Sequence, residues 1–202
     1  VIQKGLLRRS LSAIVLLAET RNPDDDDFDV RRVLFDRLNT GGEKLNPQEL
    51  RNALYPGLFN KMLIEIARAD EFASIWGIPQ RTPSEDEETP DELINNTLYK
   101  TMADCELVLR FFAIKEAIEN KSKGSLSKLL DNCMSAHSKD TEKQISQLKT
   151  EYMRCLSELN RVFDGSAFRI ETVNRPSRSL YDAMMVAVSL HAPTDIDRDK
   201  EQ

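Results

Sequence analysis

The sequence predicts a mainly α-helical fold, arranged as a helical bundle. Apolar residues recur at spacings of three and four along most of the chain, which places them on one face of successive helices. Glycine and proline are sparse, at 7 and 8 among 202 residues, and charged residues make up 31% of the chain against 40% hydrophobic residues. Because this composition is typical of a helical cytosolic protein, we expect a cytoplasmic location.

One segment near the beginning of the chain departs from the helical pattern. Residues Leu11–Ala18 are apolar, few and partly β-branched, and they precede the turn signal at Arg21-Asn22-Pro23. We interpret them as a short buried strand, with a helix as the alternative. Since the chain begins with Val1 and reaches this segment almost at once, we expect a fragment in which the sheet partners of the strand are missing.

Two predicted helices flank a diglycine loop. The first covers Phe28–Leu38 and ends at Gly41-Gly42, because glycine readily adopts the left-handed conformation that terminates helices. The carboxylates of Asp24–Asp27 before it lack the alternating ligand spacing of an EF-hand, so we interpret them as a solvated loop that caps this helix. The second helix begins at Asn46-Pro47-Gln48-Glu49, which has the cap, the first-turn proline and the glutamate of a capping box.

Further helices are predicted toward the C-terminus. The Pro-rich, acidic residues 79–90 are expected to form a mobile loop, since they offer no apolar surface to bury. The three-and-four spacing from Ile145 to Val162 resembles a coiled-coil seam, but it lasts under three heptads, so we predict packing within a bundle. The remaining helices are predicted to end near Leu54 and to cover Leu58–Ala73, Asp91–Glu119, residues 126–134, and stretches beginning near Asp140 and Pro176.

These elements divide the chain into four parts. Residues 1–78 contain the diglycine loop, 79–90 form the acidic loop, 91–192 form the helical bundle, and 193–202 form a frayed polar tail.

Charge and cysteine content exclude several classes of protein. The net charge of −6 argues against a surface that is basic throughout, as in many nucleic-acid-binding proteins, although it allows a local basic groove. Cys105, Cys133 and Cys155 are odd in number and form no Cys-x-x-Cys pair, and only His137 and His191 could join them as metal ligands. We therefore expect no structural zinc, no disulfide framework and no metal ligand. No apolar run approaches the roughly 20 residues of a membrane span, so we expect no membrane partner.

No assembled catalytic site is recognisable, and no catalytic residue is assigned. The chain lacks a nucleophile elbow, a phosphate-binding glycine loop with lysine, and a paired-histidine metal helix. The loop Asn39-Thr40-Gly41-Gly42-Glu43 is the exception, because its glycines permit close approach of a ligand such as a phosphate. The alternative is that the two glycines only turn the chain and Asn39 caps the preceding helix.

The segment Phe35–Ala53 resembles the second signature, F-x-x-x-N-x-x-G-x-x-L, of the GmrSD-type restriction endonuclease N-terminal domain family. Phe35, Asn39, Gly42 and Leu45 match it. Two weaker similarities follow in the order that the family has, at Asp104–Ala113 and Arg178–Ala183.

The resemblance implies the C-terminal helical part of a bacterial phage-defence protein, with residues 1–78 as the end of a truncated ParB-like α/β domain. The family signature Asp-Gly-Gln-Gln-Arg, associated with nucleotide hydrolysis, is absent, so no independent catalysis is expected. An NTP and Mg²⁺ are implied as cofactors of the full-length protein and none of the fragment. The implied partners are the missing ParB-like half, an HNH nuclease domain or subunit, and DNA.

The resemblance also assigns roles to single residues. Arg37, Asn39, Thr40, Gly41 and Gly42 would line a nucleotide or DNA pocket. Phe35 and Leu45 would fix the loop by packing. Glu106 and Arg110 would serve as supporting residues, and their spacing of four predicts an ordinary ion pair on one helix face.

Two functions compete for this chain. One is the helical portion of a nucleotide-dependent DNA-restriction subunit, and the other is a non-enzymatic module for protein–protein interaction. A weaker third, a DNA-binding helical domain, is suggested by Arg8-Arg9 and Arg31-Arg32 and opposed by the acidic net charge.

Overall fold

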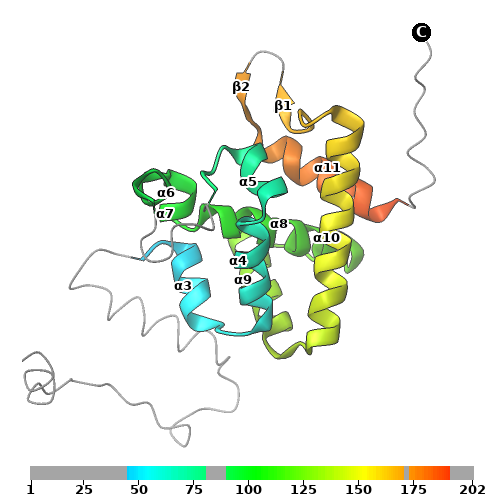
Figure 1. Ribbon diagram of the computed structural model, residues 1–202. Coiled ribbons are helices and arrows are strands. Elements are labelled where there is room, and N and C mark those ends of the chain that lie inside the picture. The colour runs from blue at the N-terminus through cyan, green and yellow to red at the C-terminus, as the bar shows by residue number, and fades with distance from the viewer. Residues whose placement is uncertain (1–44, 81–89, 171–172, 192–202) are drawn as a thin grey trace, which may run out of the picture.

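The computed structural model describes residues 45–80, 90–170 and 173–191. Within these ranges the protein is mainly α-helical, as predicted, and one two-stranded sheet accompanies the helices (Figure 1). The strand expected at Leu11–Ala18, the helix expected at Phe28–Leu38, most of the loop 79–90 and the tail 193–202 lie outside the described residues.

Helix α3 (Pro47–Leu54) begins where its capping signal predicts. Asn46 Oδ1 accepts hydrogen bonds from the backbone N–H groups of Gln48 at 2.9 Å and Glu49 at 3.0 Å. Glu49 Oε2 in turn accepts the backbone N–H of Asn46 at 2.7 Å. Both halves of the capping box are present, and Pro47 occupies the first turn, where its missing N–H has no helical partner to lose.

The single helix predicted over Leu58–Ala73 is wrong, because the chain forms two helices there. They are α4 (Leu58–Ala67) and α5 (Asp70–Trp76). Ala69 between them is extended, with φ −68° and ψ 143°, and α5 restarts with two carboxylates in its first turn, where the helix dipole favours negative charge. Gly77 ends α5 at φ 64°, in the left-handed region that glycine adopts readily.

The single helix predicted over Asp91–Glu119 is also divided. It consists of α6 (Asp91–Asn95), α7 (Thr97–Lys100) and α8 (Ala103–Glu119). Asn96 ends α6 and caps α7, because its side chain accepts the backbone N–H groups of Leu98 and Tyr99. Met102 then takes a left-handed conformation with φ 53°, which separates α7 from α8.

Helix α8 crosses the middle of the bundle, and α4, α9 and α11 pack against it (Figure 1). A helix that is apolar around its whole circumference belongs inside a domain. This confirms the central place that its sequence predicts. Its buried apolar residues are Cys105, Leu107, Val108, Leu109, Phe111, Phe112 and Ala113.

Helices α9 (Leu126–Ala136) and α10 (Glu142–Phe163) follow as predicted. The 3-10 helix η2 (His137–Lys139) between them was not predicted. A second capping box, between Thr141 and Gln144, begins α10. Helix α10 packs against α4 and α11 and buries Tyr152, Cys155 and Leu159. The regular spacing of its apolar residues therefore serves packing within the bundle, as predicted.

A short antiparallel hairpin, which the sequence does not reveal, precedes the last helix. Its strands are β1 (Arg169–Ile170) and β2 (Val173–Pro176), with Arg169 opposite Pro176 and Ile170 opposite Val173. Helix α11 (Arg178–Leu190) then begins two residues after the predicted start, with the Ser177 side chain accepting the backbone N–H of Leu180.

One hydrophobic core contains residues that precede the predicted loop 79–90 in the sequence and residues that follow it. They run from Phe59 to Ile78 and from Leu93 to Val188. The hydroxyl oxygens of Tyr152 and Tyr181 lie 2.7 Å apart inside it, and both residues are 0% exposed. Burial raises the pKa of both phenols, so they remain neutral hydrogen-bonding groups. Residues 59–78 therefore pack as part of the bundle.

Replacement of Phe111 tests whether α8 is the centre of the core. Phe111 is 0% exposed and makes edge contacts with Phe112 and Tyr152, at centroid distances of 4.9 and 5.2 Å. Phe111→Ala is expected to lower the free energy of unfolding by about 3–5 kcal/mol, measured by urea denaturation. Ile118→Ala, at a 52% exposed position of the same helix, should change it by less than about 0.5 kcal/mol. Equal losses in the two variants would contradict the central position of α8.

Candidate functional site

The predicted pocket residues Arg37, Asn39, Thr40, Gly41 and Gly42, together with Phe35, lie outside the described residues. Leu45 is described, and because its side chain is 40% exposed, it lies outside the hydrophobic core. The described residues nearest to this predicted pocket are those that anchor α3, Asn46 and Arg51.

The N-terminus of α3 is fixed to the rest of the bundle. Besides capping α3 through Oδ1, Asn46 donates from Nδ2 to the backbone carbonyl of Thr101 at 2.9 Å. Thr101 lies between α7 and α8. One side chain thus starts a helix and ties its first turn to a segment 55 residues away in the sequence.

The last turn of α3 is fixed by a buried arginine. Arg51 donates from Nε to Asp131 Oδ1 at 2.7 Å, and from Nη1 to Glu106 Oε2 at 3.3 Å and Gln48 Oε1 at 3.2 Å. Its Nη2 donates to Ser127 Oγ at 3.3 Å. The Arg51 side chain is 3% exposed, that of Asp131 8% and that of Glu106 28%. This network, the Arg51 cluster, joins α3, α8 and α9.

A second arginine pair links α8 to α11. Arg110 donates from Nε to Asp182 Oδ1 at 3.0 Å and from Nη2 to Asp182 Oδ2, a two-pronged contact that fixes the relative orientation of the groups. The hydrogen bonds to Asp182 outweigh desolvation and raise the pKa of Arg110. The predicted ion pair between Glu106 and Arg110 is therefore wrong. Glu106 contacts Arg51 of α3 and Arg110 contacts Asp182 of α11, and no local spacing in the sequence reveals either partner.

Described residues of the segments Phe35–Ala53, Asp104–Ala113 and Arg178–Ala183 contact one another. Arg51 follows the first segment's loop, Glu106 and Arg110 belong to the second, and Asp182 belongs to the third. The Arg51–Glu106 and Arg110–Asp182 contacts join the first to the second and the second to the third. Sequence reasoning missed Arg51, Asp131 and Asp182, and the spacing of these residues along the chain contains no signal for their pairing.

A third polar cluster lies where α9 ends, and we call it the His137 cluster. His137 places Nε2 against Glu116 Oε1 of α8 and Nδ1 at 2.5 Å from Asp140 Oδ2. Ligand atoms of Glu116, Cys133 and His137 all lie within 4.8 Å of one another. Burial lowers the pKa of His137, but its hydrogen bonds to Glu116 and Asp140 together outweigh burial and raise it. The signal that sequence reasoning overlooked is the spacing of four between Cys133 and His137, which places both on one helix face.

The cysteine thiols show no sign of activation as nucleophiles. Burial raises the pKa of Cys105 and Cys133, and it raises that of Cys155 to about 11. A nucleophilic cysteine requires a lowered pKa and some exposure to substrate. These three residues, all buried, are thus protonated and inert toward nucleophilic substitution at neutral pH.

One further carboxyl group is buried without full hydrogen bonding. Asp104, at the start of α8, is 1% exposed; its Oδ1 accepts the backbone N–H of Cys105, and its Oδ2 has no hydrogen-bond partner. Burial raises its pKa, against the opposing effects of these hydrogen bonds and the charge of Arg68.

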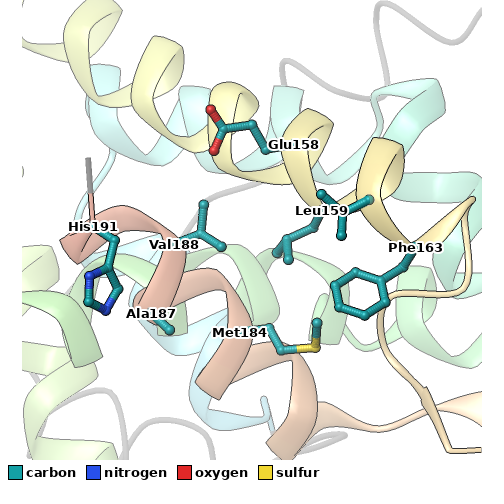
Figure 2. A pocket seen from close by; sticks show the side chains of 8 residues that line it. Glu158, Leu159, Phe163, Met184, Ala187, Val188 and His191 are labelled. Atoms are coloured by element: carbon teal, nitrogen blue, oxygen red, sulfur yellow. The ribbon is translucent and has the colours of Figure 1, made fainter. Parts of the chain in front are cut away.

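An apolar groove of about 580 Å³ lies between α10 and α11 (Figure 2). Figure 2 shows Leu159 and Phe163 of α10 facing Met184 and Val188 of α11. The polar members of its lining are Glu158 and His191. The side chain of Phe163 is 43% exposed, so the groove offers an apolar surface on the outside of the bundle.

No protein-family model, curated protein or solved structure matches the chain. Along the described residues, no helix has both the length and the apolar character needed to cross a membrane.

The Arg51 cluster makes a specific prediction about stability. Arg51→Met removes the cation and leaves a buried carboxylate at Asp131, so we expect a loss of about 3–5 kcal/mol in the free energy of unfolding. Adding Asp131→Leu should recover part of this loss, which a double-mutant cycle by urea denaturation measures. Lys149→Met, which breaks an exposed ion pair with Glu65, should cost less than about 1 kcal/mol. A cost for Arg51→Met as small as that of the control would show that the cluster does not hold α3.

The His137 cluster predicts a pH dependence of stability. Because the folded-state pKa of His137 is raised, its contribution to stability is complete below about pH 6.5 and is lost as pH rises through the folded-state pKa. The groups that face it are Glu116 from α8, Cys133 from α9, Asp140, and the ring of Phe59 from α4.

Urea denaturation of the chelator-treated chain at pH 6 and pH 9 checks this dependence. The stability difference between wild type and His137→Gln is expected to be larger at pH 6. His191→Gln, at an exposed histidine, should leave the dependence unchanged. A difference that is the same at both pH values would mean that the charged imidazole contributes nothing.

Proposed function

We propose that this chain is the helical portion of a bacterial, cytoplasmic, nucleotide-dependent DNA-restriction subunit that acts in defence against phage. In this function the bundle is catalytically incomplete. It holds the loop Asn39–Gly42 against a pocket that a ParB-like domain completes, and it works with an HNH nuclease domain or subunit on DNA. An NTP and Mg²⁺ are the cofactors of the complete pocket.

The observation that carries the proposal is the meeting of the three family-like segments through Arg51–Glu106 and Arg110–Asp182. Arg51 and Glu106 are 55 positions apart in the sequence, and Arg110 and Asp182 are 72 positions apart. Both pairs nevertheless form direct hydrogen bonds. Ion pairs that join such distant segments support the interpretation that the segments form one structural unit rather than three chance similarities.

The anchoring of α3 supports the role assigned to the loop before it. Asn46 fixes the first turn of α3 to Thr101, and Arg51 fixes its last turn to α8 and α9. A loop that presents an asparagine amide and backbone N–H groups to a phosphate works best when its attachment point does not move, because a pre-organised site loses less entropy on binding.

Nucleotide binding by the protein expressed from its complete reading frame tests the proposal. We expect it to bind a nucleoside triphosphate with Mg²⁺, and Asn39→Ala to weaken binding about tenfold or more, since a lost hydrogen bond to a charged phosphate costs about 1.5–3 kcal/mol. Isothermal titration with non-hydrolysable ATP and GTP analogues gives both affinities.

Asn120→Ala is the matched control, because Asn120 is exposed at the end of α8 and lies outside the family-like segments. It should leave nucleotide affinity and phage resistance unchanged. Absence of nucleotide binding by the folded protein, or equal affinities for the two variants, would contradict the proposal.

The groove between α10 and α11 favours a second candidate, a non-enzymatic module for protein–protein interaction. An exposed apolar surface of this kind is typical of sites where proteins associate. In this case Asn39→Ala would leave phage resistance intact, while Phe163→Glu in the groove would abolish it.

A further inference from the structure

The His137 cluster combines three kinds of metal-binding atom from two helices. Cys133 and His137 lie one turn apart at the end of α9, and Glu116 reaches them from the last turns of α8. Their sulfur, nitrogen and oxygen atoms all lie within 4.8 Å of one another. Ligands of a tetrahedral zinc ion lie about 3.3–3.8 Å apart, since each stands about 2.0–2.3 Å from the metal. Glu116 and His137 are already in direct contact, so zinc binding requires this pair to open by about 1 Å while the Cys133 sulfur approaches by up to about 1 Å. The Glu116 side chain, 31% exposed, has room to move.

The orientation of the imidazole also fits metal binding. His137 Nδ1 lies 2.5 Å from Asp140 Oδ2, so a neutral ring that donates Nδ1–H to Asp140 directs the lone pair of Nε2 toward Glu116 and Cys133. Histidine ligands in metal sites commonly donate their second nitrogen to a carboxylate in this way. The ring of Phe59 stacks on the imidazole at a centroid distance of 4.5 Å and an interplanar angle of 22°, which holds the ring plane.

We propose that Glu116, Cys133 and His137 bind one Zn²⁺ ion, with water in the fourth position and Asp140 orienting the histidine. The mixture of thiolate, imidazole and carboxylate selects zinc over Mg²⁺ and Ca²⁺, which prefer oxygen ligands alone. The ion joins the ends of α8 and α9.

Zinc binds cysteine as a thiolate and histidine as a neutral imidazole, so metal binding at this position releases protons and zinc affinity should rise with pH.

Metal titration of the chain, reduced, chelator-treated and free of any purification tag, tests the proposal. We expect one Zn²⁺ per chain with a Kd below about 1 µM, by competition with a chromophoric chelator. Co²⁺ should give the near-ultraviolet thiolate charge-transfer band and the intense visible bands of a tetrahedral site. Excess Mg²⁺ should not compete.

Variants distinguish this site from adventitious binding. Cys133→Ser and Glu116→Gln should weaken zinc binding about 100-fold, and Asp140→Asn about 10–100-fold, as expected for a carboxylate that orients a histidine ligand. Cys155→Ser, at a buried thiol of α10, is the matched control and should bind as the wild type does. Circular dichroism monitors folding, and the partly exposed Glu116 gives a variant in which the core is untouched.

Three results would overturn the proposal. They are zinc affinity of the folded wild type no greater than that of Cys133→Ser, a Co²⁺ spectrum without a thiolate band, and loss of binding in Cys155→Ser equal to that in Cys133→Ser. Each would mean that the His137 cluster is a network of hydrogen bonds around a charged imidazole and holds no metal.

Discussion

The guanidinium of Arg51 sets the position of α3, because a buried cation is tolerated only where anions and acceptors surround it. Removing such an ion from water costs several kcal/mol, and the close contact with Asp131 and the acceptors of Glu106, Gln48 and Ser127 offset this cost. Apolar side chains pack in many arrangements of similar energy, whereas this set of donors and acceptors is satisfied in only one. The geometry of the α3, α8 and α9 ends therefore follows from a single charged side chain.

The same constraint appears one turn further along α8. There Arg110 and Asp182 fix α11, while the paired hydroxyls of Tyr152 and Tyr181 place a directional contact inside an otherwise apolar core. Helix α8 thus receives specific polar contacts from α3 and α11, and its apolar residues supply the bulk of the stabilisation.

The sequence allowed prediction of those features that depend on neighbouring residues. The capping box at Asn46, the start of α10 near Asp140 and the apolar character of α8 are all local, and each was predicted. The divisions at Ala69 and Met102 were not, because the apolar spacing continues through both, and a left-handed methionine is imposed by packing rather than by its own preference. The short hairpin before α11 lacks the alternation of apolar and polar residues that reveals longer strands.

Fewer features of the candidate sites were predicted, for a related reason. The family-like segments identified Glu106 and Arg110, but their true partners lie 55 and 72 positions away, and sequence spacing carries information only about residues within a few turns. Cys133 and His137 were within reach of such spacing. The lack of a Cys-x-x-Cys pair says nothing about such a mixed pair, and Glu116 joins them only because α8 and α9 pack together.

Attachment of α3 at both of its ends has a mechanical consequence. A helix held by one end swings, and a force applied to the preceding chain would then dissipate in that motion. With Asn46 bound to Thr101 and Arg51 bound to two other helices, α3 transmits displacement like a rigid lever seated in the bundle. A displacement of the chain before residue 46 would therefore reach α8 through α3. It would then reach α9 and α11, which pack against α8.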